Sequence, residues 1–566
     1  MTQDKYIVLI VPSGEDDSVV PQRSGGRDSM ESTYDGIIIG GGPNGLCAAA
    51  YMAKAGQKIL VLERRMEIGG GLATEQVTIP GFLHNTHAVY HAMVDYAPIF
   101  QDLRLQEDYG LRFIRPETVM SMPMADGRSI SIYGDPERTC ASIAKLSQHD
   151  ADAYRETYHL FRRFMDEFLA PATYVRAHPA FEAMIKMEQY DLTRELRTYQ
   201  EKSPQQIVDE IYENEHVRAL MLYAACKWGL DYDLEGLGFL VPLYLDRAAH
   251  YAVCVGGSHR LSHVISKFVY DHGGMVWGSA LIKRILVEEG VAKGVELENG
   301  TVIHANWVAS TIDPYQTFLD YVGEENLTPD FARRTRDFQW EGMSLYGVHM
   351  ALKRAPEFTA AAGNPDINRS FINVIGCETE DDLIDHWEAV RAGELHDGGF
   401  NCAFPSVHDP TQAPKGRHTG LISQHAPYHL KEGAEHWWDV RQEHAARLIA
   451  TLRRYAPNID DDNLLWHYVS TPLDIENKFI NMREGSIKVG GYYPLQMGYL
   501  RPNEDCSRHV TPIENLYLGG ASVFPGGLVL FGSGYNCATA ICEDQGIEPW
   551  WEPPPYVQEA IDKDLL

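Results

Sequence analysis

Short apolar runs separated by glycine turns begin the chain after a polar N-terminal stretch. The run YDGIIIG at residues 34–40 predicts a buried strand, and PNGLCAAAYMAKAG at residues 43–56 predicts a helix. KILVLE at residues 58–63 predicts a second buried strand. Continuous apolar runs of this length are typical of strands that are covered on both faces. The pattern therefore predicts a βαβ unit at the start of an α/β fold.

The middle of the chain carries two further patterns. Within residues 150–235, large apolar side chains recur at spacings of three or four, which places them on one face of a helix; they are Tyr154, Tyr158, Phe161, Met165 and Phe168. Residues 340–470 mix strands with a helix near residues 434–456. Between these regions, residues 273–311 predict short strands with a turn at Glu298-Asn299-Gly300.

Residues 516–541 contain no Asp, Glu, Lys or Arg. A membrane-spanning helix needs about 20 mostly apolar residues, so this stretch is long enough to be considered. It also holds six glycines and Pro525, and in a helix interior each glycine costs roughly 1 kcal/mol and a proline about 3 kcal/mol relative to alanine. We therefore expect a buried strand at its start, a glycine-rich turn, and a helix from about Gly532 to Asp544.

Bulk composition narrows the class of protein. At 566 residues the chain should hold two domains. A net charge of −30 argues against nucleic-acid binding and opposes docking on anionic lipid. The nine cysteines are scattered and include no Cys-x-x-Cys, which argues against a thiol–disulfide enzyme and a zinc ribbon. We expect reduced thiols in a reducing compartment. No secretory or transit signal is evident, so we expect a cytoplasmic location, and we expect the polar residues 1–32 to be a disordered tail.

One motif carries chemistry. Gly40, Gly42 and Gly45 fit Gly-x-Gly-x-x-Gly between the first predicted strand and helix, and Glu63 ends the second strand. In such a motif the glycines permit a tight turn, close approach of a pyrophosphate and close helix–strand packing, while the acid binds a ribose. The helix dipole stabilises the phosphate charge. A glycine turn without a ligand is the alternative, but four features agree on a dinucleotide.

Longer segments resemble a known family. VLERRMEIGGGLATEQVTIPGF at residues 61–82 resembles the opening of the phytoene desaturase-related flavoprotein family. Three more segments resemble the other flavin segments of this family. They are LYLGGASVFPGG and GSGYNCATA near the C-terminus and GSALIKRILVEEGVAKGVELENG in the middle. The resemblance covers residues 34–548, and within the family it is strongest to the subgroup named pyridine nucleotide-disulfide oxidoreductase domain-containing protein 2. The absent Cys-x-x-Cys argues against thiol–disulfide chemistry.

The resemblance implies FAD in an extended pose. It places the pyrophosphate at the glycine motif, the adenosine at Glu63, and the flavin against the charge-free C-terminal stretch. The implied cofactor-binding residues are Gly40, Gly42, Pro43, Asn44, Gly45, Glu63, Arg64, Gly70, Gly71, Ile282, Gly520, Ala521, Gly527, Leu528 and Val529. Ala521 stands where many related FAD enzymes have an Asp, which favours this branch over the amine oxidases. A helix start near Gly527 is expected to aim N–H groups at the flavin.

The expected fold is α/β (α+β overall). A Rossmann-like FAD-binding domain is built from residues 33–84, 252–313 and 484–550. An inserted substrate-binding domain of mixed sheet and helix comprises residues 85–251 and 314–483. Residues 551–566 are expected to be a C-terminal tail.

The function that the resemblance implies is an FAD-dependent oxidoreductase of the desaturase or dehydrogenase type. It takes a hydride from a largely apolar small molecule, such as a carotenoid or another isoprenoid. With a single dinucleotide fingerprint, the electron acceptor is expected to be oxygen or a quinone. The alternatives are an amine oxidase, ketolase, saturase or isomerase on the same scaffold, or a non-catalytic flavin-stabilised interaction protein. The oligomeric state and peripheral contact with a membrane stay open.

Candidate catalytic residues are fewer. His84, His87 and His91 are spaced so that the last two would share a face of a helix. No carboxylate or cysteine joins them, so we expect no metal, and we take His87 as the candidate acid–base residue. Three aromatic segments are expected to line either an apolar substrate tunnel or the core. They are HYVSTP, GGYYPLQMGYL and KWGLDYD. Tyr492 and Tyr493 are the candidate substrate residues.

Overall fold

The computed structural model describes residues 33–566, and the tail expected at residues 1–32 lies outside them. β1 (Thr33–Ile39), α1 (Pro43–Lys54) and β2 (Ile59–Leu62) form the βαβ unit that the apolar runs predict. β1 pairs in parallel with β2 and with β12 (Val302–Ser310). Residues Ile37, Ile38, Leu60 and Val61 have no solvent exposure, which explains the unbroken apolar character of these strands.

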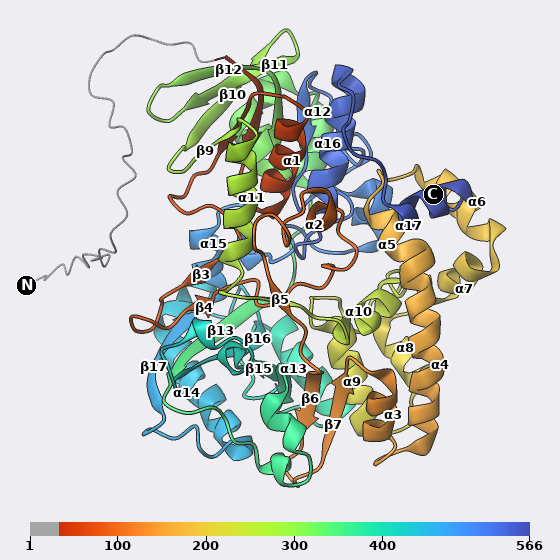
Figure 1. Cartoon of the computed structure of the whole chain (residues 1–566), viewed down its shortest axis with the longest axis vertical. Coiled ribbons are helices and arrows are strands. Elements are labelled where there is room, and N and C mark those ends of the chain that lie inside the picture. The colour runs from red at the N-terminus through yellow and green to blue at the C-terminus, as the bar shows by residue number, and fades with distance from the viewer. Residues whose placement is uncertain (1–32) are drawn as a thin grey trace, which may run out of the picture.

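The first sheet is parallel in its centre (Figure 1). Strands from the end, middle and start of the chain share this sheet. In order, they are β18 (Leu516–Leu518), β12, β1, β2 and β9 (Met275–Trp277). The hairpin of β10 (Ile282–Glu288) and β11 (Val291–Leu297) joins the edge of β12. The predicted turn at residues 298–300 follows β11, where the Gly300 N–H donates to the Leu297 carbonyl.

Helices cover this sheet closely. α1 packs against α11 (His259–Asp271) and α16 (Gly532–Gln545), and the start of α16 is where the sequence predicted a helix. A Cβ at Gly534 would lie 2.3 Å from the Asn44 carbonyl oxygen, so only glycine lets the two helices meet there. The C-terminal part of the fold is thereby fixed directly on the first helix.

The second sheet has the strand order β17-β13-β16-β15-β14-β6-β7 and lies below the first in Figure 1. All its pairings are antiparallel except that of β14 with β6. Its strands are β6 (Thr118–Pro123), β7 (Ser129–Tyr133), β13 (Ser344–Leu352), β14 (Ile372–Ile375), β15 (Phe400–Ala403), β16 (His418–Ala426) and β17 (Leu464–Ser470).

Side-chain alternation gives this sheet two different faces. Tyr346, Val348 and Met350 of β13 join a core with α14 (Trp437–Tyr455), the helix expected near residues 434–456. Leu345 and His349 point to the opposite face, toward the first sheet. The sheet therefore keeps one face for its own core and offers the other to a ligand.

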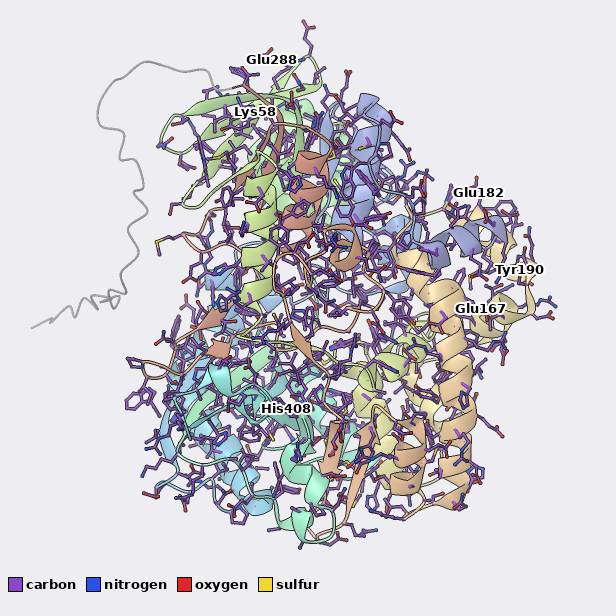
Figure 2. The ribbon with its side chains drawn as sticks, viewed as in Figure 1. Lys58, Glu167, Glu182, Tyr190, Glu288 and His408 are labelled. Carbon is purple, nitrogen blue, oxygen red and sulfur yellow. The ribbon has the colours of Figure 1, made fainter. Side chains whose placement is uncertain are left out.

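A layer of helices lies at the right of Figure 1, beside the second sheet. It contains α3 (Pro136–Ile143), α4 (Gln148–Phe164), α6 (Ala180–Gln189), α7 (Asp191–Gln200), α8 (Pro204–Ile211), α9 (Glu215–Cys226) and α10 (Leu240–Ala248). The predicted apolar stripe runs along α4 into a π-helical turn at Met165–Leu169, and Tyr154, Phe161 and Met165 are buried. Glu182 and Tyr190 mark the outer edge of the layer (Figure 2).

Shorter elements complete the chain. They are β3 (Thr74–Glu75), β4 (His84–Asn85), α2 (Ile99–Asp102), β5 (Phe113–Ile114), α5 (Ala170–Thr173), β8 (Val253–Cys254), α12 (Pro329–Arg336), α13 (Glu380–Arg391), α15 (Pro472–Lys478) and α17 (Pro555–Asp562). The expected C-terminal tail thus contains α17, which buries Val557 and Ala560. The proposed domain boundaries stay a prediction.

Two global features bear on function. None of the helices within residues 33–566 is long and apolar enough to cross a membrane. All nine cysteines lie in this part of the chain, where each is buried with a free thiol.

Candidate cofactor and substrate site

The glycine motif forms the loop between β1 and α1. Gly40 has a φ of +99°, which a side chain would strain, and a Cβ at Gly45 would lie 2.0 Å from the Gly40 carbonyl oxygen. At Gly42, in contrast, no atom lies within 4 Å of the position that a Cβ would take. Gly40 and Gly45 are thus needed by the fold, whereas Gly42 keeps a space open beside the helix.

The N-terminus of α1 suits an anionic group. No side chain caps it, and its first turn holds no acidic residue. Its free N–H groups and the positive end of the helix dipole therefore face the space at Gly42. This is the arrangement that proteins use for phosphates, so the loop fits the pyrophosphate of a dinucleotide.

Glu63 directly follows β2 and lies beside the glycine loop. Its carboxylate accepts hydrogen bonds from the Gly41 N–H at 2.9 Å and from the Arg65 N–H at 2.8 Å. An ionised carboxylate has about four acceptor positions, which leaves acceptors for ribose hydroxyls. The structure therefore positions Glu63 firmly without using up its hydrogen-bonding capacity.

Ile282 and Arg64 both lie near Glu63. The Ala280 N–H donates to the Glu63 carbonyl at 2.9 Å, which brings the start of β10, where Ile282 stands, next to Glu63. Arg64 donates to the Lys478 carbonyl at the end of α15 at 2.9 Å. Arg64 therefore links the two sheet regions, and its role toward adenine stays a prediction.

An inner cavity of about 270 Å³ lies between the two sheets. Three distant segments of the chain line it: the glycine loop, Gly70 with Gly71, and residues 521–529. The open face of the second sheet closes it with Leu345, Gly347, His349, Ile372, Asn401, Ala403, Leu421, Ser423 and His425. Of the predicted cofactor residues, the cavity brings together Gly42, Pro43, Asn44, Gly45, Gly70, Gly71, Ala521, Gly527, Leu528 and Val529.

The wall at residues 520–529 is held from behind by a buried arginine. A Cβ at Gly520 would lie 2.5 Å from the Thr311 carbonyl oxygen, so the chain passes close to the end of β12. Arg501 has no solvent exposure and donates to the carbonyl oxygens of Ala521, Gly491, Gly490, Val489 and Lys488. Because a buried charge without partners is costly, Arg501 needs these carbonyl groups as hydrogen-bond acceptors. The same hydrogen bonds fix the two loops together.

The expected helix start near Gly527 is wrong. α16 begins at Gly532, and Leu528, Val529 and Phe531 adopt positive φ angles in the turn before it. The Gly527 N–H donates to the Tyr492 hydroxyl at 3.1 Å. The turn therefore presents Leu528 and Val529 to the inner cavity, and no helix N-terminus lies at Gly527.

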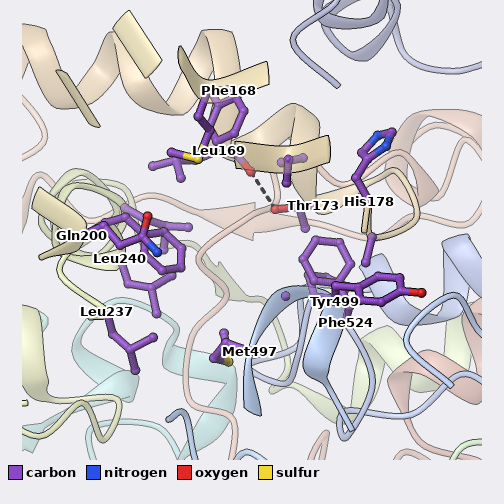
Figure 3. A pocket seen from close by; sticks show the side chains of 18 of the residues that line it. Phe168, Leu169, Thr173, His178, Gln200, Leu237, Leu240, Met497, Tyr499 and Phe524 are labelled. Atoms are coloured by element: carbon purple, nitrogen blue, oxygen red, sulfur yellow. Dashed lines mark hydrogen bonds between the residues drawn. The ribbon is translucent and has the colours of Figure 1, made fainter. Parts of the chain in front are cut away.

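A larger outer chamber of about 770 Å³ adjoins the inner cavity. Figure 3 shows its apolar lining, which includes Phe168, Leu237, Leu240, Met497 and Phe524. Ala92, Trp228 and Leu528 line both spaces, so the two are neighbours across these side chains.

The two candidate tyrosines behave differently. Tyr492 lines the outer chamber and supports the Gly527 backbone. Tyr493 borders neither of these two spaces, because its ring packs over Gly491 and its hydroxyl donates to the Trp340 carbonyl at 3.1 Å.

The histidine cluster does not form a helix. His84 lies in β4, and the backbone of His91 pairs with Ala252, so His87 and His91 share no helix face. His87 lines the inner cavity against the Phe479 ring, and its Nε2 has no partner. Burial, with help from the charges of Lys478 and Arg65, holds the pKa of His87 well below its ordinary value. Within residues 33–566 no group of three or more His, Cys, Asp or Glu side chains is placed to hold a metal.

Sequence reasoning missed several polar residues of the cavity. Lys227, Asn401, His349 and His425 line it, and each comes from an element of the helical layer or the second sheet. Lys227 and Trp228 stand in the segment KWGLDYD, whose aromatic residues are its only conspicuous signal in the sequence. The alternating apolar pattern of the second sheet could have located His349 and His425, but only once the sheet was known to face a ligand.

Comparison with known proteins agrees with this geometry. Residues 38–104 match the family model described as NAD(P)-binding Rossmann-like domain. The chain is 38% identical over 547 residues to one component of the limonene dehydrogenase of Castellaniella defragrans, covering 94% of this chain and 98% of the relative. The chain belongs to the phytoene desaturase-related family of FAD-dependent oxidoreductases. It is therefore an oxidoreductase, as the sequence predicted.

Other members of the family are more distant. Pyridine nucleotide-disulfide oxidoreductase domain-containing protein 2 of Rattus norvegicus is 27% identical over 92% of this chain and 95% of its own length. The neurosporene-forming phytoene desaturase of Rhodobacter capsulatus is 22% identical over 89% of this chain and 93% of its own. An oxidoreductase structure from Methanosarcina mazei has a TM-score of 0.57 at 15% identity, covering 90% of this chain and 99% of that one, which confirms the predicted fold class.

Proposed function

We propose that this family member binds FAD in an extended pose and oxidises a largely apolar small molecule beside the flavin ring. The observation that carries the proposal is the inner cavity, where segments at residues 42–45, 70–71 and 521–529 meet. The adenosine lies toward Glu63 and Ile282, the pyrophosphate at the N-terminus of α1, and the flavin in the inner cavity. The free helix N-terminus and the open space at Gly42 support this placement.

The substrate we propose is an isoprenoid hydrocarbon. The names of two relatives state that they act on limonene and phytoene, both of which are apolar. The outer chamber supports the same class, since Leu237, Leu240, Met497 and Phe524 supply its lining. Because the flavin occupies the inner cavity, the substrate must reach it from the outer chamber, past Trp228 and Leu528.

Bound FAD supplies a two-electron acceptor, while the chain orients the substrate and excludes water. The apolar lining excludes water from the reacting C–H bond. Arg501 and the close contact of Gly520 with Thr311 hold the wall at residues 520–529 in place. With one dinucleotide fingerprint in the sequence, we propose oxygen or a quinone as the final electron acceptor.

An amine substrate is less well supported. A protonated amine in a buried site needs a negative or strongly polar partner. Among the described residues, none of those lining the inner cavity is an Asp or a Glu, whereas Lys227, His87 and His349 are present. The electrostatics of the cavity therefore favour a neutral substrate over a cationic one.

We also propose that apolar substrate reaches the outer chamber from a membrane surface. Phe181 and Met184 on α6 line the chamber and are 69% and 47% exposed. The neighbouring Ile185 is 45% exposed, so an apolar face lies at the edge of the chamber. With a net charge of −30, the protein would favour a zwitterionic surface over an anionic one.

The test begins with the absorbance spectrum of the purified protein, which should show bound flavin. Glu63→Ala should purify with much less FAD and an unchanged circular dichroism spectrum, because it removes the ribose acceptor but no core side chain. Glu63→Gln keeps one acceptor oxygen and should retain more. Limonene and phytoene are then added to the FAD-loaded protein without oxygen, and one of them should bleach the flavin absorbance. A colourless protein that does not take up FAD would refute the proposal.

A further inference from the structure

Lys227 is the least expected polar residue of the inner cavity. It follows α9 directly, and its side chain lines the cavity together with that of Tyr223, one helical turn earlier. The residue is 7% exposed, and its Nζ has no hydrogen-bond partner. A buried lysine normally pairs with an acid, so this amine is free for another purpose.

The surroundings of Lys227 contain aromatic faces in place of carboxylates. Its Nζ lies 4.4 Å from the ring centre of Tyr90 and 4.8 Å from that of Tyr251. These two rings stack on each other at 4.1 Å. An ammonium is attracted electrostatically to such ring faces. The pocket therefore accepts a proton on the amine without holding a permanent counter-ion.

The other titratable groups near this amine are neutral or already paired. The Trp387 indole N–H donates to His425 Nδ1 at 3.2 Å, so His425 carries its proton on Nε2 and donates it to the Lys227 carbonyl at 3.0 Å. Tyr223 accepts a hydrogen bond from Asn401. Beyond Trp228, Lys488 is paired with Glu341 at 2.8 Å.

We propose that Lys227 is the catalytic base that takes a proton from the substrate during the oxidation. The inference rests on the proposed hydride-transfer function. One C–H bond breaks and its hydrogen leaves with both electrons to the flavin, which oxidises the substrate by two electrons. The adjacent C–H bond breaks, its electron pair forms the C=C bond, and its proton goes to Nζ. The ammonium then returns this proton to solvent.

This assignment prefers Lys227 to His87. Burial opposes protonation of both groups, but His87 also lies near the cationic side chains of Lys478 and Arg65, which oppose protonation of its ring further. Burial lowers the pKa of the Lys227 amine well below its ordinary value, which favours the uncharged form that can accept a proton. Because only the neutral amine acts as a base, flavin reduction should slow as the pH falls through this lowered pKa and reach a plateau above it.

A first experiment measures the charge of Lys227 without any substrate. The FAD-loaded protein is treated with formaldehyde and cyanoborohydride, and mass spectrometry follows methylation of Lys227 and of the exposed Lys415. An ordinary lysine loses about 100-fold of its free amine between pH 9 and pH 7. We expect Lys227 to lose much less, so that the ratio of its labelling to that of Lys415 rises as the pH is lowered. Parallel decline of the two residues would overturn the assignment.

A second experiment measures anaerobic flavin reduction by the substrate that reduces the wild type. Lys227→Met and Lys227→Gln should retain FAD and its visible spectrum but reduce it at least roughly 100-fold more slowly, within the range that one acid–base group contributes. His87→Gln is the matched variant in the same cavity and should be affected less. Wild-type rates in both Lys227 variants, or slow reduction in His87→Gln alone, would reject the base. If no substrate reduces the wild type, the proposed function fails while the labelling result still stands.

Discussion

Gly42 and Gly45 lie in one loop, but their missing side chains serve different purposes. At Gly45 the backbone of Gly40 occupies the space, so the residue is dictated by packing. At Gly42 the space is open and the backbone, with φ −76° and ψ −179°, is accessible to any residue. A ligand that approaches the backbone closely would explain the glycine at position 42.

This difference gives a sharp test. Gly42→Ala should leave the unfolding temperature of the FAD-free protein unchanged but weaken FAD binding by roughly tenfold or more, a loss of at least about 1.4 kcal/mol. Gly45→Ala should lower the unfolding temperature even without FAD, since overpacking costs about 1–3 kcal/mol. Calorimetry and flavin titration measure the two effects. Normal FAD affinity in Gly42→Ala would place the pyrophosphate elsewhere.

The positions of single residues were predicted correctly where local geometry decides them, and their roles toward a cofactor stay a prediction. The glycine motif and Glu63 follow from one strand, one turn and one helix, all of which the apolar runs mark. Lys227 could not be found in this way, because its burial depends on Tyr90, Tyr251 and the second sheet. The fan of hydrogen bonds from Arg501 likewise joins loops that only the tertiary fold brings together.

Among the elements, strand alternation and helix packing determine which side chains are buried and which face the cavity. The second sheet buries Tyr346, Val348 and Met350 against α14 and turns the intervening residues toward the cavity. The sequence predicted the strand–turn–helix at β18 and α16 because a short apolar run and glycines are local signals. The spacing of His87 and His91 would put them on one face of a helix, but the backbone of His91 pairs with Ala252, and spacing alone cannot distinguish these two structures.

α10 offers a test of the outer chamber. Leu240 projects into it beside Leu237 and Phe168 (Figure 3). Leu240→Trp should raise the KM of the apolar substrate roughly tenfold, about 1.4 kcal/mol, because the larger ring fills space that the substrate needs. Leu240→Met conserves volume and should have little effect. Steady-state kinetics and the flavin spectrum are measured together, and an unchanged KM in the Trp variant would exclude the chamber from the substrate path.

At the scale of the whole molecule, the two sheets and the helical layer enclose two neighbouring spaces with different linings. The inner cavity lies between the sheets. The outer chamber is lined by helices of the helical layer, among them α6 and α10. The overall resemblance of the sequence to one family correctly predicted this architecture. The size of the outer chamber was not predictable, because it is the space left between side chains from α5 to α10 and from residues 492–530.

The proposed approach to a membrane is tested with the full chain. We expect the protein to sediment with phosphatidylcholine vesicles, and the double variant Phe181→Ser, Met184→Ser to bind at least roughly tenfold less, because each buried apolar side chain contributes about 1.5–3 kcal/mol. Trp466 is an apolar side chain on β17 of the second sheet and is 59% exposed, so Trp466→Ser is the matched control. Equal binding of both variants, or a preference for anionic vesicles, would contradict the approach through α6.

The cavity wall that contains Leu528 and Val529 is built last during synthesis. β18, which precedes this wall, pairs with β12, and α16, which follows it, packs on α1. A nascent polypeptide that ends before residue 529 can form the glycine loop but cannot enclose the ring system. We therefore expect the proposed cofactor to be enclosed only once residue 529 has been synthesised, and a truncation before β18 and α16 should leave it held at one end only.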